Sequence, residues 1–212
     1  MKFLIILTLF NYGFAYLMSS SISLSKFSNE PANNFIDKSK EVYNNVYNIM
    51  NSEKKFCFIS TISVEKNIKG YPFGSVAGYT LNGYGMPSFA LSDLSRHSKN
   101  IKENDCVSVV FIEKNINSLD QKRLIITGNL KKIQNTYSDE GYKIPSRETI
   151  LYKEMYLRSH PNSVWVDFPD INMYVLSKIK DVYYVGGYAK AQQIHVKKFI
   201  DLMNNKYPSN AD

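Results

Sequence analysis

The sequence predicts a mainly β protein with flanking helices (α+β), whose strands form a closed antiparallel barrel. Aromatic residues make up 14% of the 212 residues, and they lie in Val- and Ile-rich runs that favour strands over a helical bundle. Hairpin signals and a few short helices join these runs, which favours an antiparallel barrel over a parallel doubly wound sheet. The 44% hydrophobic content, with 21% charged residues, excludes intrinsic disorder.

The first 15 residues are predicted to be a signal peptide. Lys2 precedes the apolar run Phe3–Phe10, and the small residues Gly13 and Ala15 are spaced as at a signal-peptidase site, so we expect cleavage after about Ala15. The run is shorter than the ~20 residues needed to span a bilayer, which predicts no stable membrane anchor. We therefore expect a protein of the secretory pathway, either secreted or endolysosomal.

Residues 16–33 are expected to be disordered or transit-like, because the stretch is rich in Ser and Asn and poor in charge. A plastid transit peptide behind a signal peptide has a comparable composition, so a plastid location is the alternative. No linker rich in Pro and Gly divides the rest of the chain. One barrel domain is therefore expected over residues 34–204, followed by a polar tail over residues 205–212.

The domain is expected to begin with an amphipathic helix over Asn34–Lys54, in which Phe35, Val42, Val46 and Ile49 share one face. β-Branched and aromatic residues fill Phe56–Val64, which predicts a strand buried on both faces or nearly so. The next two strands, Ser75–Thr80 and Pro87–Leu91, flank Asn82-Gly83-Tyr84-Gly85. The glycines of that segment supply the positive φ that a tight hairpin requires.

Asp93 is expected to cap a short helix, Asp93–Glu103, and start the second half of the domain. Further strands are predicted at Cys106–Ile112, Arg123–Ile133, Met173–Ile179 and Val182–Val185, and further helices at Arg147–Ser159 and His195–Asn204. The two Cys of the chain, Cys57 and Cys106, lie in apolar strand-like runs. We expect both to be buried free thiols, although oxidation in the secretory pathway is the alternative.

The formal net charge of +7 suits anionic ligands, anionic membranes or nucleic acid. The basic pairs Lys131-Lys132 and Lys197-Lys198 are short and lack interleaved aromatic residues, so no nucleic-acid partner is expected. The sequence has no phosphate loop, no His-Glu-x-x-His zinc helix, no Cys-x-x-Cys pair and no Gly-x-Ser-x-Gly elbow. Nucleotide hydrolysis, zinc hydrolysis and the α/β-hydrolase mechanism therefore lack support.

One corner of the predicted barrel suits a phosphate monoester. A strand that ends at Ser92, followed by a helix start and then by His97 and Lys99, brings a hydroxyl, a helix N-terminus and a positive charge together. Gly74 would let the backbone approach a flat ligand, and Ser75 and Val76 beyond it could offer main-chain groups to the edge of an aromatic ring. Taken singly, each of these residues also suits an ordinary strand start or a solvated helix face.

Five segments in a fixed order carry a family resemblance: Gly70–Val76, Leu91–Asn100, Leu124–Gly128, Arg158–Pro161 and Val185–Ala191. Their order and spacing resemble the pyridoxamine 5′-phosphate oxidase-like split barrels. Within that family they are similar to the branch of HugZ-type haem-degrading proteins, plastid glutamyl-tRNA reductase-binding proteins and secreted CREG-type glycoproteins. The resemblance covers about residues 52–194 and implies a six-stranded Greek-key barrel that forms a homodimer. It also implies flavin mononucleotide (FMN) in a groove between the subunits.

The resemblance implies an FMN-dependent oxidoreductase or a redox- or ligand-sensing protein, of unknown substrate. Residue by residue, the flavin contacts would fall on Ser75, Val76, Ser92, His97, Lys99 and Asn100. No counterpart of the substrate-phosphate residues of pyridoxamine phosphate oxidase follows Ala191, so that reaction is not expected. The resemblance leaves a second reading open, a secreted CREG-type interaction protein that binds a protein partner and whose flavin groove is blocked.

Haem binding or haem breakdown is the third reading that the resemblance allows. It needs a histidine as axial ligand of the iron. His195 follows the last predicted strand, in the C-terminal stretch where the HugZ branch presents its haem ligand, and is the candidate. His97 suits the phosphate corner better, and His160 suits a helix C-terminus. The alternative for His195 is an ordinary surface residue on a basic helix that binds no ligand.

Overall fold

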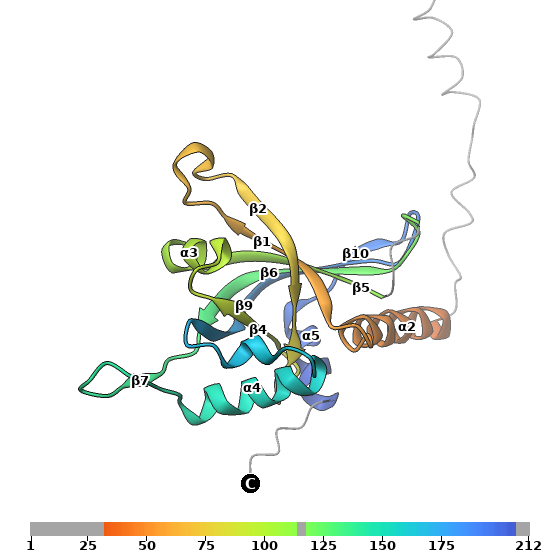
Figure 1. The fold of residues 1–212 in the computed structure, drawn as a ribbon. Helices are drawn as coiled ribbons and strands as arrows, with labels where there is room; N and C mark the ends of the chain where they lie inside the picture. The colour runs from red at the N-terminus through yellow and green to blue at the C-terminus, as the bar shows by residue number, and fades with distance from the viewer. Residues whose placement is uncertain (1–31, 114–117, 207–212) are drawn as a thin grey trace, which may run out of the picture. The chain divides into compact units, whose positions relative to one another are not determined.

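The computed structural model describes residues 32–113 and 118–206, and a sheet of antiparallel strands with helices packed against it forms the main body (Figure 1). Contacts divide the chain into residues 1–39 and residues 40–212, and the description below concerns the second unit. The predicted signal peptide, nearly all of the segment that follows it and most of the polar tail lie outside the described residues. Among the helices described, none is long and apolar enough to cross a membrane.

Six long strands form the frame of an eight-stranded sheet. They are β1 (Phe56–Ile62), β2 (Pro72–Gly78), β4 (Pro87–Ser92), β5 (Cys106–Ile112), β6 (Arg123–Lys132) and β9 (Ile171–Val185), joined by the short strands β3 (Thr80–Leu81) and β10 (Ala191–Gln193). The order is β2-β1-β5-β6-β9-β4-β3, and β10 pairs with β9. All pairings are antiparallel, and no described ladder joins β2 to β3, so the barrel is split. This confirms the predicted mainly β class with flanking helices and an antiparallel split barrel, whereas the expected closure of the barrel was wrong.

Strand β1 corrects the expectation of burial on both faces. Cys57, Ile59 and Thr61 point into the core, whereas Phe56 and Phe58 on the opposite side are exposed. The alternation has the period of two that a half-buried strand requires, but apolar residues occur in both sets of positions, with the two Phe in the outer set. An apolar side chain on the outer face therefore resembled a core residue in the sequence.

Strand β9 runs without interruption over 15 residues where the sequence predicted two strands. Its register with β6 shifts beside Gly128, and the ladder continues past each shift. A Cβ atom at residue 128 would overlap the Lys178 carbonyl oxygen, so this irregularity needs glycine. Near the other end of the sheet, the predicted hairpin at residues 82–85 is confirmed, and Gly85 supplies the positive φ of 71°.

The helices are α2 (Ala32–Met50), α3 (Arg96–Glu103), α4 (Arg147–Ser159) and α5 (Val196–Lys206), with 3₁₀ turns η2 (Lys66–Ile68) and η3 (Val164–Asp167). Ser95 caps α3, since its Oγ accepts a hydrogen bond of 3.1 Å from the backbone N–H of Ser98. The predicted cap Asp93 lies outside the helix and pairs with Lys132 at 3.0 Å. A two-stranded ribbon, β7 (Thr136–Tyr137) and β8 (Lys143–Ile144), was not predicted.

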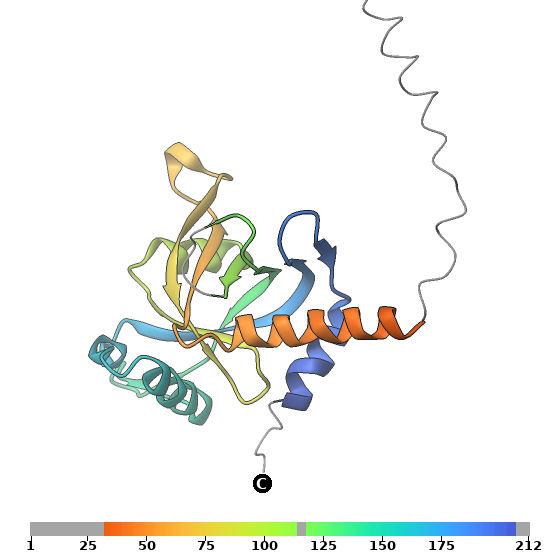
Figure 2. The ribbon, with the colours of Figure 1, turned by 90° about the vertical axis from the view of Figure 1, so that its right-hand side faces the viewer.

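Two hydrophobic clusters form the core of residues 40–206. The larger cluster fills the barrel and includes Ile49 of α2 and Phe199 of α5, and the smaller one includes Tyr156 of α4. Figures 1 and 2 show the ribbons of these helices from two directions. Both cysteines are free thiols, as expected. Cys57 is buried, but Cys106, at the start of β5, is exposed, so the expected burial of that thiol was wrong.

Candidate functional site

His97 is the centre of a polar network that joins α3 to β1 and β2. Its Nδ1 lies 3.0 Å from the Thr61 hydroxyl, and its Nε2 lies 2.7 Å from the Ser75 hydroxyl. Asn100, one turn further along α3, donates from Nδ2 to the Thr61 hydroxyl at 2.8 Å and accepts at Oδ1 from the Val64 backbone N–H at 3.0 Å. We call Thr61, Ser75, His97 and Asn100 the His97 network.

The His97 network is largely shielded from solvent. Thr61, His97 and Asn100 are buried, while Ser75 lies at the exposed end. Burial lowers the pKa of His97 below its ordinary value, so the imidazole is neutral at pH 7. A neutral imidazole has one donor and one acceptor nitrogen, and Thr61 and Ser75 engage both. Three of the predicted flavin contacts, Ser75, His97 and Asn100, therefore do lie together, but all three are already hydrogen-bonded to protein groups.

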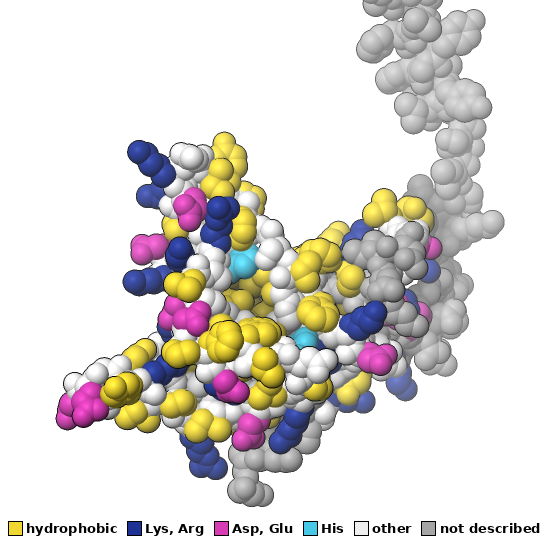
Figure 3. Space-filling model, in the orientation of Figure 1, with side chains coloured by type: hydrophobic (Ala, Val, Ile, Leu, Met, Phe, Trp, Pro, Cys, Tyr) yellow, Lys and Arg dark blue, Asp and Glu magenta, His cyan; other side chains and the backbone are white. Residues whose placement is uncertain are grey.

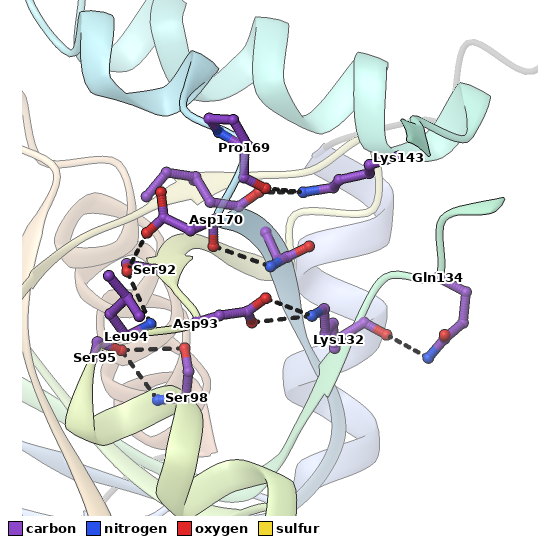
Figure 4. Close-up of polar contacts among 12 residues, drawn as sticks. Ser92, Asp93, Leu94, Ser95, Ser98, Lys132, Gln134, Lys143, Pro169 and Asp170 are labelled. Carbon is purple, nitrogen blue, oxygen red and sulfur yellow. Dashed lines mark hydrogen bonds and ion pairs between the residues drawn. The ribbon is translucent and has the colours of Figure 1, made fainter. Parts of the chain in front are cut away.

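The other three predicted contacts lie elsewhere. Ser92 donates a short hydrogen bond to the Asp170 carboxylate and accepts one of 3.0 Å from the Leu94 backbone N–H (Figure 4). Lys99 follows His97 by two residues on α3, which places it on the opposite side of the helix, where it lines a separate surface pocket. Val76 is exposed on the outer side of β2. The six residues thus do not converge on one phosphate corner.

An apolar row crosses the outer face of the sheet. Residues paired directly across antiparallel strands share a face, and the register aligns Val76, Phe58, Val110, Ile125 and Tyr183 on five neighbouring strands. The exposed fractions are 59% for Val76, 42% for Phe58 and 41% for Tyr183. We call these five residues the outer row. Figure 3 shows one face of the molecule hollowed between the β1–β2 hairpin and α4, with hydrophobic side chains gathered along the hollow.

The three histidines differ in their surroundings. His97 is saturated by hydrogen bonds. His160 lies at the C-terminus of α4, as predicted, with Nε2 3.0 Å from the Tyr79 carbonyl oxygen and its ring 4.5 Å from that of Tyr156. His195 is exposed, and no side-chain hydrogen bond to it occurs among the described residues. Its neighbour Ile194 is buried in the core, where its N–H donates to the Val182 carbonyl at 2.8 Å.

The position of His195 follows from strand pairing. Gln193, two residues earlier, pairs with Tyr183, the last member of the outer row. The buried Ile194 fixes this segment against β9, so the exposed imidazole lies at the β10 edge of the sheet, two residues beyond the partner of Tyr183. No group of three or more His, Cys, Asp or Glu suited to a metal ion occurs in the described ranges. Haem iron, held by the porphyrin, needs only one or two protein ligands.

Sequence reasoning missed Thr61 and Asp170. Thr61 binds both His97 and Asn100, and Asp170 binds Ser92, yet each lies far from its partner in the sequence. The only signal for Thr61 was a polar residue at an inward position of β1, since buried polar groups require partners. Asp170 lies in a loop, and its sequence context carried no signal.

A half-open antiparallel sheet with six long strands, flanking helices and an uncovered outer face defines a split-barrel protein. The family model for the CREG β-barrel matches residues 48–201, and the chain belongs to this family. The solved neighbours agree with the fold. A heme binding protein from Mycobacterium smegmatis superposes with a TM-score of 0.62 at 19% identity, over 76% of this chain and 60% of that one.

Two further similar proteins are also named for haem. HutZ of Vibrio cholerae, described as a heme storage protein, superposes with a TM-score of 0.54 at 16% identity, over 69% of this chain and 96% of that one. The chloroplastic heme oxygenase HOZ of Arabidopsis thaliana is 28% identical over 133 residues, which are 63% of this chain and 37% of HOZ. The chain thus spans little more than a third of that relative. At these identities the solved structures establish the shared fold.

Proposed function

We propose that this protein binds haem, with His195 as the axial ligand of the iron. The observation that carries the proposal is the exposed imidazole without a hydrogen-bonded partner among the described residues, two residues beyond Gln193, which pairs with Tyr183 of the outer row. The descriptions of three relatives as haem-binding, haem-storing or haem-degrading proteins support the same ligand. His97 is excluded as a ligand because Thr61 and Ser75 occupy both of its ring nitrogens.

The residues present fit the group. A porphyrin is a flat, largely apolar ring, and the outer row offers exposed apolar side chains at the side of the sheet that ends in Tyr183. His195 supplies a nitrogen ligand that needs no rearrangement of the core, because only Ile194 and Val196 beside it pack inward. Bound haem would supply iron-centred redox chemistry, and the chain would supply the ligand and the apolar surface.

Haem titration followed by absorbance tests this proposal. The purified protein should shift the Soret band of added haem with a midpoint in the micromolar range, and His195→Ala should abolish that shift. Imidazole added to the His195→Ala protein should restore a ligated spectrum if the apolar surface still holds the porphyrin. His160→Ala removes a histidine that faces Tyr79 and Tyr156 and should retain the shift. Equal shifts in the wild-type and His195→Ala proteins would refute the assignment.

A homodimer formed through the outer row is the second part of the proposal. Val76 and Phe58 are exposed at the end of the row away from Tyr183, and a second copy of the chain would cover this end while the Tyr183 end stays free for haem. Light scattering should find a dimer at micromolar concentration, and Phe58→Glu should give a monomer because it places a charge within the row. The matched control is Leu119→Glu, which adds the same charge at an exposed position outside the row and should leave the dimer intact. A wild-type monomer would contradict this part.

FMN binding and flavin-dependent oxidoreduction form the second candidate function. The observation in its favour is that Ser75, at the exposed end of the His97 network, and its neighbour Val76 are both exposed on β2. Their main-chain groups would meet the edge of a flavin ring there. FMN titration followed by flavin fluorescence should show quenching that Val76→Glu removes. A protein that binds neither FMN nor haem would instead act as a CREG-type interaction module.

The proposal also includes the cellular compartment of the protein. We expect the protein to enter the secretory pathway, with a plastid as the alternative, on the residues of its first 33 positions. N-terminal sequencing of the protein from its natural source should find a mature chain that begins near Tyr16. A chain that retains Lys2 and Phe3 would contradict cleavage, and one that begins near residue 34 would favour the plastid route.

A further inference from the structure

A surface pocket lies on the side of α3 opposite the His97 network, between α3, β6 and β9. Its volume is about 600 Å³. Four lysines line it, Lys99 and Lys102 from α3 and Lys131 and Lys132 from the end of β6. The pocket is separate from His195 and from the outer row, so an inference from it does not rest on haem binding.

The lysines of this pocket carry more charge than the pocket's own acids neutralise. Lys132 pairs with Asp93 at 3.0 Å (Figure 4). The other acid of the lining, Asp105, accepts a hydrogen bond of 2.6 Å from Asn129. Within the part of the chain that the structure describes, no carboxylate lies within ion-pair distance of Lys99, Lys102 or Lys131. Four ammonium groups and two carboxylates therefore border one concave surface, which leaves a net charge of +2, and Lys99, Lys102 and Lys131 are not held in ion pairs within the described residues.

The inner wall of the pocket offers neutral hydrogen-bonding groups. The hydroxyls of Ser98 and Tyr174 belong to this wall, and both residues are buried. Ile101 and Leu130 complete the wall with apolar surface. A solvated helix face would carry lysines alone, whereas here they border a recess that contains two hydroxyls. This combination suits a compact anion with several oxygen atoms attached to a less polar body.

We propose that this pocket binds a phosphorylated small molecule. The ammonium groups of Lys102 and Lys131 would contact the phosphate oxygens, and the Tyr174 hydroxyl would provide a hydrogen bond from the inner wall. Lysine is a compact point charge, and several lysines around one recess favour a group of high charge density such as phosphate over a single carboxylate. The volume is large enough for a ligand larger than inorganic phosphate.

Calorimetric titration with inorganic pyrophosphate at low salt tests the pocket. The double variant Lys102→Ala/Lys131→Ala should weaken binding at least tenfold, because it removes two of the four ammonium groups of the pocket and with them its net positive charge. Lys197→Ala/Lys198→Ala on α5 removes the same net charge from exposed positions away from the pocket and should change the affinity less than twofold. Tyr174→Phe changes no charge at neutral pH and should weaken binding about threefold. Melting temperatures within two degrees of the wild type would establish that the variants fold.

Two outcomes would overturn the proposal. Equal weakening by the α3–β6 and α5 double variants would mean that pyrophosphate responds only to net charge. Absence of measurable binding in the wild-type protein would remove the site. Neither outcome affects the haem titration, because the His195→Ala protein retains the whole pocket and should bind pyrophosphate with unchanged affinity.

Discussion

The environments of His97 and His195 differ in almost every respect. His97 lies between a helix and two strands, with both ring nitrogens hydrogen-bonded and a pKa that burial lowers. His195 lies at the edge of the sheet, exposed, and no side-chain hydrogen bond holds it among the described residues. The first environment uses the imidazole to join secondary-structure elements. The second leaves the imidazole nitrogens available to the proposed ligand, and this difference in environment can be tested by substitution.

Substitution of His97 by Ala should have the largest effect. It removes a buried ring that contacts Phe73 at 5.0 Å between ring centroids, and it leaves the Thr61 and Ser75 hydroxyls without their partner. We expect the free energy of unfolding to fall by about 3 kcal/mol, measured by urea denaturation. A loss below about 1 kcal/mol would mean that the His97 network contributes little to stability and is better regarded as a ligand site.

Thr61→Val should have the next largest effect. Valine has nearly the shape of threonine, so the change removes the hydroxyl without opening a cavity, and the groups of His97 and Asn100 that face it lose their partner. We expect a loss of about 2 kcal/mol. Ser75→Ala is the matched comparison at the exposed end of the network, where water can replace the hydroxyl, and should cost about 1 kcal/mol or less. Equal losses would contradict the distinction between the two ends.

The stability of the protein should depend on pH through His97. Because burial lowers its pKa in the folded state, the unfolded chain binds a proton first as the pH falls through about 6.5. Unfolding then becomes easier at lower pH, and the free energy of unfolding should fall by about 1 kcal/mol between pH 7.5 and pH 5.5. Urea denaturation at the two pH values measures this. In His97→Gln the difference should shrink, and an unchanged difference would assign it to other groups.

The smallest expected effect on stability is that of His195→Ala. An exposed side chain without a hydrogen-bonded partner in the described chain contributes little, so the free energy of unfolding should change by less than about 0.5 kcal/mol. Thermal and urea denaturation of the ligand-free protein measure this change. A loss comparable to that of Thr61→Val would mean that His195 is part of the structure, and the proposed contrast would then fail.

Most of the fold could be predicted from the sequence because its signals are local. Helix α4 was predicted with its observed bounds, and the hairpin at residues 82–85 and strand β5 were also predicted correctly. The errors have physical causes. Exposed Phe56 and Phe58 made β1 resemble a fully buried strand, and Asp93 resembled a helix cap although its carboxylate binds Lys132. The uninterrupted β9 could not be predicted because its bulges depend on β6, a distant partner.

The candidate site was less predictable. The family resemblance named Ser75, His97 and Asn100, which the structure does bring together, but also Ser92 and Lys99, which it separates. Proximity in the sequence placed His97 and Lys99 in one corner, whereas the helical period places them on opposite sides of α3. A histidine can bind a ligand only if one of its ring nitrogens lacks a hydrogen-bonded partner. For His97 this depends on Thr61, which is distant in the sequence, so no sequence pattern predicts it.

The resonance Raman spectrum of the reduced haem complex tests the central claim most directly, because an iron–histidine stretching band reports the axial ligand itself. The wild-type and His160→Ala complexes should show this band. The His195→Ala complex should lack it while the protein remains folded. A band that persists unchanged in His195→Ala would contradict the assignment of the exposed histidine as the ligand, and with it the contrast between the two environments.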